Sequence, residues 1–218
     1  MAALIEVAGI EVSVEADPPP VVRGLAGDLV ACLDDDSFAE LTRRAGGVVG
    51  VRSATTPEAV TARIADGRVA LAHGQGGEPD VTATAELGSV GADPAIEGGD
   101  RHPELAEWTA RLLRPPTPPL ELAAERFWSQ LSRLRRSTRA LVLVDLESGE
   151  RRRYGPDEGP ACELHGTPGG LLAVLTGRSS AIEAAFDGTV FIRGSFPDLS
   201  VLSGAGFRVR YGGAPNGG

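Results

Sequence analysis

The sequence predicts an α+β fold with mainly antiparallel strands, and three observations support this prediction. Short β-branched segments separated by turn residues follow one another over 48–87, which is typical of an antiparallel meander. Segments with apolar residues at helical spacing stand before and after them. Four prolines within 112–120 remove hydrogen-bond donors and force extended backbone, which indicates a linker between two halves.

In the N-terminal half, we expect a hairpin, two helices, the meander and a further helix. An apolar alternation over 4–14 predicts a strand or hairpin, which the prolines at 18–20 separate from the first helix. Helical spacing over 21–44 predicts two short helices, with the run 34–37 as a break and N-cap. Asp66-Gly67 is a good type I′ hairpin turn. Strands are predicted at 48–51, 59–64, 68–71 and 81–87, and a helix at 103–113.

In the C-terminal half, we expect a helix first and then short strands and helices. The helical period at 120–134 ends in a cluster of arginines, which we interpret as a solvated helix end because cations are favourable there. Pro168 at a first-turn position and Gly177 after the last turn predict the limits of one helix. Strands are predicted at 140–146, 151–154, 161–164 and 189–193, and helices at 167–175, 179–186 and 198–203. The glycine-rich residues 212–218 are expected to be disordered.

The composition argues against several classes of function. The chain has 218 residues, of which 42% are hydrophobic, and this is enough for one large core or two small ones. Its formal net charge of −9 disfavours binding to nucleic acid or to anionic membranes, since both need a basic face. Every basic side chain is arginine, which excludes a lysine nucleophile or Schiff base. The N-terminal segment resembles neither a signal peptide nor a membrane anchor, and we expect a cytoplasmic protein.

The two halves show a weak internal similarity. Residues 38–41, followed by strands and an Asp-Gly turn, parallel 127–131, followed by strands and a Ser-Gly turn. Residues 81–87 correspond to 161–164, and helical sequence follows each of them. A duplicated module is the favoured interpretation. Because the identity is low, chance similarity between two ordinary α+β segments remains the alternative.

Two short sequence motifs follow each other within 162–178 and 184–199. The first is Thr176-Gly177-Arg178 at the end of a predicted helix, and the second runs from Gly188 to Gly194 with the form Gly-x-Val-x-Ile-x-Gly. Their ordered combination resembles the C-terminal half of the sterol carrier protein type two family, over about 127–209 of this chain. The resemblance implies a curved, mainly antiparallel sheet that helices cover on one face, with an apolar tunnel between the layers.

The resemblance also implies how the chain divides. Residues 1–114 are expected to form a degenerate sterol-carrier-like module with an extra N-terminal strand, 115–120 a proline-rich linker, and 121–211 a second module. The first module departs from the family over 88–101, which are acidic and glycine-rich where the family has a helix. The same module also resembles the C-terminal domain of the mycothiol-dependent maleylpyruvate isomerase family. The His-rich helices of that family's metal-binding bundle are absent from this sequence.

The leading functional hypothesis is the binding or carriage of an apolar small molecule in an internal cavity, such as a lipid, a fatty acyl chain or a polyketide-like metabolite. Apolar ligand surface leaves water at about 25 cal/mol per Å², so such a ligand needs few polar contacts. The residues that we expect to line the cavity are Leu171, Leu172, Leu175, Ile182, Phe186, Phe191, Phe196 and Leu202. An ordinary hydrophobic core without a cavity would require the same residues.

Two alternatives are an enzyme of the isomerase or cyclase type that uses the cavity as a reaction chamber, and a non-catalytic interaction module. For the enzyme, the candidate acid/base groups are His165, Glu163 and Tyr154. The histidines show no metal-ligand spacing, and neither a GxSxG elbow nor a phosphate-binding loop occurs, so no metal and no cofactor are expected. Cys32 and Cys162 lack a CxxC spacing and are expected to be small buried residues.

Overall fold

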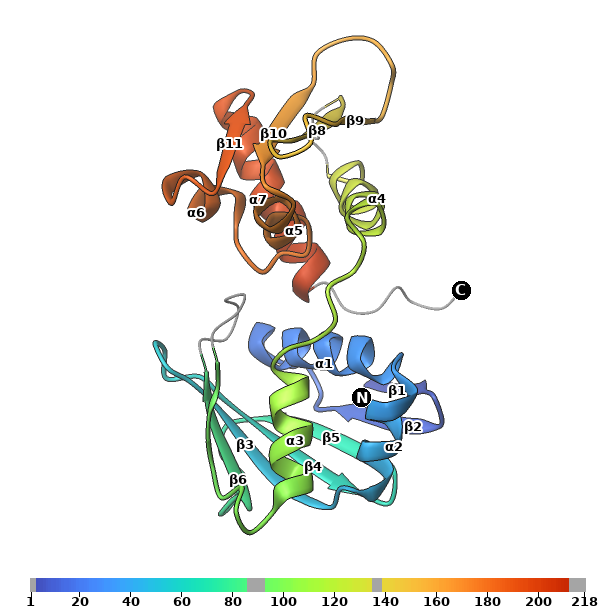
Figure 1. Cartoon of the computed structure of the whole chain (residues 1–218), viewed down its shortest axis with the longest axis vertical. Coiled ribbons are helices and arrows are strands. Elements are labelled where there is room, and N and C mark those ends of the chain that lie inside the picture. Colours follow the sequence, from blue (N-terminus) through green and yellow to red (C-terminus); the bar gives the residue numbers. More distant parts are fainter. Residues whose placement is uncertain (1–2, 86–92, 135–138, 212–218) are drawn as a thin grey trace. The chain divides into compact units, whose positions relative to one another are not determined.

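The computed structural model describes residues 3–85, 93–134 and 139–211, and it divides into two compact units (Figure 1). The first unit comprises residues 1–116 and the second residues 117–212, so that the division falls within the proline-rich segment. Each unit has a β-sheet, a set of helices and a hydrophobic core of its own. The predicted α+β class is confirmed. Arg135, Arg136 and the tail 212–218 lie outside the described residues.

The first unit contains a seven-stranded sheet in the order β1-β2-β5-β4-β3-β6-β7. Its neighbouring strands are antiparallel except for the parallel pairs β2–β5 and β3–β6. The strands are β1 (Ala3–Val7), β2 (Ile10–Val14), β3 (Gly47–Ser53), β4 (Ala59–Ala65), β5 (Arg68–His73), β6 (Val81–Ala85) and β7 (Ala95–Glu97).

The expected meander is correct for β3, β4 and β5 and wrong for β6. Asp66 and Gly67 both have positive φ, at 50° and 70°, as the type I′ turn between β4 and β5 requires. The chain then crosses back, and β6 pairs with β3 in parallel. Asp80 holds this crossover in place: its backbone N–H donates to the Val48 carbonyl at 2.8 Å, and its carboxylate accepts from the Val48 N–H at 2.8 Å.

Three helices pack on the sheet of the first unit: α1 (Pro20–Leu33), α2 (Asp36–Arg44) and α3 (Pro103–Leu112). The break between α1 and α2 falls at the acidic run, where the Asp35 side chain accepts from the Ser37 N–H and so caps α2. Trp108 on α3 stacks on Phe38 with 5.8 Å between ring centroids, and its indole N–H donates to the Thr42 hydroxyl at 3.0 Å. These contacts fill the space between helices and sheet.

The second unit contains a four-stranded sheet in the order β11-β10-β8-β9. The central pair β10–β8 is parallel, and each outer strand is antiparallel to its neighbour. Four helices accompany this sheet, and residues of all four, α4, α5, α6 and α7, form a core with its buried face. The elements are α4 (Leu120–Leu131), β8 (Leu141–Asp145), β9 (Arg151–Tyr154), β10 (Cys162–Gly166), α5 (Pro168–Leu175), α6 (Ala181–Phe186), β11 (Val190–Arg193) and α7 (Phe196–Tyr211).

Helix α7 is much longer than the predicted helix at 198–203. Gly204 and Gly206 lower its intrinsic helix propensity, which is why the sequence pattern indicates an earlier end. Gly206 packs against Gly177, which follows α5, and Gly206 also lies next to Phe127 of α4. Tertiary packing therefore continues the helix through two residues that disfavour it.

The two sheets share one arrangement of four strands. The order β4-β3-β6-β7 in the first unit and β9-β8-β10-β11 in the second are both antiparallel, parallel and antiparallel in turn. The expected match of 81–87 with 161–164 agrees with this order, although Leu87 lies outside the described residues. The expected match of the two turns does not agree with it. Ser148-Gly149 joins β8 to β9, whereas Asp66-Gly67 joins β4 to β5.

Candidate functional site

The eight predicted lining residues fall into two groups. Leu171, Leu175 and Leu202 are completely buried in the packed core of the second unit, and Leu172 lies half-buried against it. Close helix packing explains this, because a Cβ on Gly170 would lie 2.8 Å from the carbonyl oxygen of Thr189. The other four are exposed: Ile182, Phe186, Phe191 and Phe196.

A groove lies along β11, between the end of α6 and the start of α7. Its volume is about 330 Å³. It contains two of the predicted residues, Phe191 and Phe196, and six that the sequence did not single out. The complete lining is Ala185, Val190, Phe191, Ile192, Gly194, Ser195, Phe196 and Leu199.

Local interactions hold both walls of the groove. Ser180 and Glu183 form a capping box that starts α6, with distances of 3.0 and 3.1 Å. At the other wall, the Asp198 carboxylate accepts from both the backbone N–H and the hydroxyl of Ser195, each at 2.7 Å. Gly194 allows the turn between β11 and α7, because a Cβ there would lie 2.9 Å from the sulfur of Cys162.

Exposed phenylalanines gather around this groove. The chain has six phenylalanines, and Phe38 and Phe127 are buried in the two cores. Phe186, Phe191 and Phe196 are 87%, 61% and 85% exposed, and all three lie within eleven consecutive residues. Exposed apolar patches of this kind commonly mark binding surfaces. The spacing of these aromatic residues is a signal that sequence reasoning can find, whereas their exposure is not.

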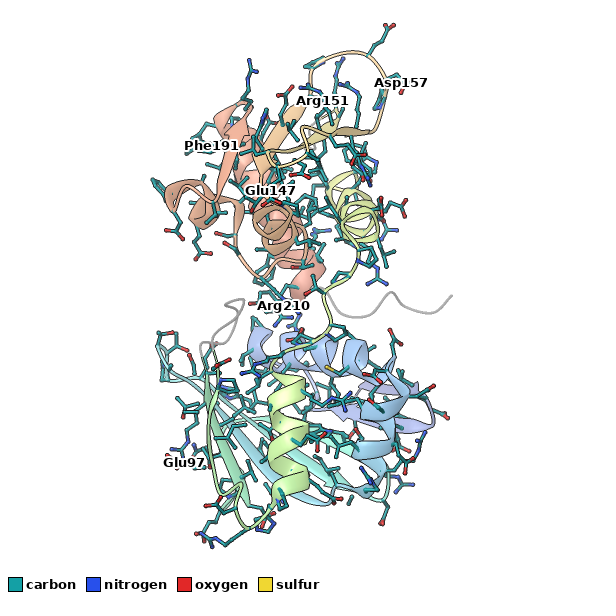
Figure 2. The ribbon with its side chains drawn as sticks, viewed as in Figure 1. Glu97, Glu147, Arg151, Asp157, Phe191 and Arg210 are labelled. Carbon is teal, nitrogen blue, oxygen red and sulfur yellow. The ribbon has the colours of Figure 1, made fainter. Side chains whose placement is uncertain are left out.

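Two of the three candidate acid/base residues meet on the open face of the sheet. The Nε2 atom of His165 lies 2.8 Å from Oε2 of Glu163, and Arg151 forms a salt bridge with Oε1 of the same carboxylate. Arg151 and Phe191 lie on the two outer strands of this sheet (Figure 2). The hydrogen bond from His165, and then the hydrogen bond and the positive charge of Arg151, hold the pKa of Glu163 below its ordinary value. Glu163 is therefore a carboxylate at neutral pH, engaged by His165 and Arg151 and in a longer contact with Arg193 at 4.0 Å.

Tyr154 lies on the opposite face of the sheet. Leu141 pairs with Tyr154 on one side and with Cys162 on the other, so these three side chains point to the same face. That face carries the core, and burial raises the pKa of Tyr154. The sheet separates Tyr154 from Glu163 and His165, and the three residues do not form one catalytic group.

In the part of the chain that the structure describes, the cysteines and the ionisable clusters provide no further site. Cys32 and Cys162 are buried in different units and form no disulfide, and burial raises the pKa of Cys162 to about 12. Over the described residues, histidine, cysteine and acidic side chains form no group that could hold a metal ion. Within the same residues, no helix has the length and apolarity to cross a bilayer. Comparison with known proteins found no matching family model, no similar curated protein and no similar solved structure.

Proposed function

We propose that the second unit binds an apolar small molecule in the groove beside β11. The observation that carries this proposal is the apolar lining of the groove, with Phe191 and Phe196 exposed at it. Its volume of about 330 Å³ is at the lower end of the range of about 300–1,000 Å³ that ligand pockets occupy. The site differs from the expected internal tunnel, since it opens along the edge of the sheet.

Apolar contact would provide most of the binding energy. Covering about 100 Å² of the exposed rings would contribute about 2.5 kcal/mol, at about 25 cal/mol per Å². Ser195 adds little polar recognition, because its N–H and its hydroxyl already donate to Asp198. The groove therefore suits a ligand that is recognised by shape and apolar surface, such as a lipid-like or polyketide-like molecule.

The shared strand order supports the proposal that the chain contains two copies of one sterol-carrier-like module. In both units a helix precedes a hairpin, a later strand pairs in parallel with the first strand of that hairpin, and a helix follows the last strand. The first unit differs by its N-terminal hairpin β1–β2 and by the additional strand β5.

The geometry gives less support to an enzyme. Glu163 and His165 are bonded to each other, and Arg151 occupies the second carboxylate oxygen. Tyr154 faces the core. These contacts favour a structural role for the pair on the open face of the sheet.

Binding of a neutral fluorescent apolar dye, such as Nile red, tests the proposed function. Phe196→Ser removes an exposed ring from the groove, and we expect at least a fivefold loss of dye affinity. Phe207→Ser is the matched control, because Phe207 is also exposed on α7 but does not line the groove. Native mass spectrometry of the purified protein would show a co-purifying apolar ligand. Wild-type protein that binds no dye, or equal binding by the two variants, would contradict the proposal.

A further inference from the structure

The strand β11 forms an edge of the second sheet, because among the strands of the described residues it pairs only with β10. The opposite edge, β9, is protected against pairing with another chain by its charged sequence Arg-Arg-Arg-Tyr. Arg153 also binds the loop after β9, by donating to the carbonyls of Pro156 and Gly159. The sequence of β11 is Val-Phe-Ile-Arg, in which three residues are apolar and a single residue, Arg193, is charged, so it provides less such protection than β9 does.

The direction of the backbone groups on β11 follows from the hydrogen bonds of β10. Cys162 donates to the Ala140 carbonyl and Gly166 accepts from Leu146, so alternate residues of β10 direct their backbone groups towards β8. Glu163 and His165, which lie between them, direct theirs towards β11.

Glu163 pairs with Arg193 and His165 with Phe191. Phe191 and Arg193 therefore use their backbone groups to bond β10. The backbone groups of Val190 and Ile192 point to the free edge, alongside the groove that both residues line.

We propose that β11 pairs antiparallel with β11 of a second copy of this chain, and that the two four-stranded sheets become one sheet of eight strands. Residues whose backbone groups point to the free edge must lie opposite each other in the paired strands. This requirement limits the register to one centred on Phe191 or one centred on Ile192. The proposed register is the one centred on Ile192, because it uses Val190, Ile192 and Gly194 and forms about six hydrogen bonds, two for each facing pair.

The register centred on Ile192 also places Phe191 opposite the partner's Arg193. Arg193 is exposed, and its contact with Glu163 is long, at 4.0 Å. A guanidinium beside an aromatic ring is a favourable cross-strand neighbour. The strand is thus complementary to a second copy of itself, which is what a twofold interface requires.

Charge and area are both consistent with a second copy as the occupant. Residues 117–212 contain 11 acidic residues and 12 arginines, so the second unit does not repel itself, whereas 19 of the 30 acidic residues lie in residues 1–116. Phe186, Phe191 and Phe196 of two copies, at about 150 Å² each, would bury on the order of 900 Å². These rings would then provide roughly half to three quarters of a standard interface of about 1,200–2,000 Å².

Pairing at this edge would cover the groove, because Val190 and Ile192 of the second copy lie along it. If the groove is also the ligand site, as proposed above, ligand binding and pairing exclude each other. Saturating amounts of an apolar ligand are then expected to convert dimers to monomers.

Sedimentation velocity of the full chain over a range of concentrations tests the pairing. We expect a wild-type dimer, and we expect Phe191→Arg to raise its dissociation constant at least tenfold because it places arginine opposite the partner's Arg193. Phe191→Glu places a carboxylate there and is expected to keep the dimer. Phe191→Arg combined with Arg193→Glu is expected to restore it, which separates loss of pairing from misfolding. Phe207→Arg is the control on a different exposed phenylalanine.

The outcomes separate this inference from the proposed function. A wild-type monomer at about 100 µM in protein free of bound ligand, or equal association of the Phe191→Arg and Phe191→Glu variants, would overturn the pairing while leaving dye binding to be judged by its own assay. A dimer that behaves as expected but binds no apolar dye would overturn the proposed function and leave the pairing in place.

Discussion

Gly177 allows α5 to end directly against α7, and its replacement tests how the core of the second unit is closed. The residue has φ of +70°, and a Cβ at this position would lie 2.2 Å from the carbonyl oxygen of Gly206. It would also lie 2.8 Å from the Cβ of Arg210. Because the first of these neighbours is backbone, Gly177→Ala can be accommodated only if α7 moves away from α5.

A matched control exists in Gly188, whose φ of +69° is almost the same but whose Cβ would have no atom within 4 Å. Gly188→Ala should cost only the strain of a left-handed backbone, about 1–2 kcal/mol. Gly177→Ala adds an overpacking cost of about 1–3 kcal/mol, so its total cost should be about 2–5 kcal/mol. For a unit of this size, each kcal/mol shifts the melting temperature by about 4–8 °C.

Guanidinium unfolding followed by tryptophan fluorescence measures this difference. The chain has two tryptophans, Trp108 in the first unit and Trp128 in the second, so that Trp108→Phe leaves a signal from the second unit alone. In that background we expect Gly177→Ala to lower the free energy of unfolding more than Gly188→Ala does. Equal losses would show that the close approach of α7 does not determine the requirement for glycine.

Three further predictions concern stability. Thr42→Val leaves the buried indole N–H of Trp108 without its acceptor and should lower the free energy of unfolding by about 1–3 kcal/mol. Thr109→Val should cost less, because the Thr109 hydroxyl donates to a carbonyl of its own helix. Equal losses for the two variants in urea unfolding would contradict this. Glu163→Gln removes a carboxylate whose folded pKa lies below 4.5, so the contribution of that carboxylate to stability is present above pH 4.5 and is lost as the pH falls through the folded pKa. Wild type and variant should therefore differ in free energy of unfolding near neutral pH and converge in acid, and a difference that is independent of pH would argue against the ion pair. Ser180→Ala removes the capping box of α6 and should lower the free energy of unfolding by about 1 kcal/mol, as measured by thermal unfolding. Ser180→Thr keeps a hydroxyl and should cost less. Equal losses for the two variants would refute a role for the hydroxyl.

Features that depend on a few neighbouring residues were predicted well. The Asp66-Gly67 turn, the cap of α2 near Asp35 and the start of α5 at Pro168 all appear where the sequence indicates. Each depends on backbone preferences or hydrogen bonds over two to four residues, which are encoded locally.

Features that depend on contacts between distant segments were predicted poorly. The parallel pairing of β6 with β3, the continuation of α7 through Gly206 and the separation of Tyr154 from His165 by the sheet all follow from packing. Arg151 was missed as a partner of Glu163 for the same reason, because strand β8 lies between their strands.

The sequence by itself determined the α+β class, most of the helices and strands, and the concentration of phenylalanines in the last third of the chain. Only the tertiary structure decided that those phenylalanines are exposed, because burial depends on how closely helices approach the sheet. The contact between Gly177 and Gly206 allows α5 and α7 to approach each other closely, and leucines fill the interior between helices and sheet. Phe191 and Phe196 lie instead along the edge of β11. The candidate site lies at that edge because the interior is already occupied.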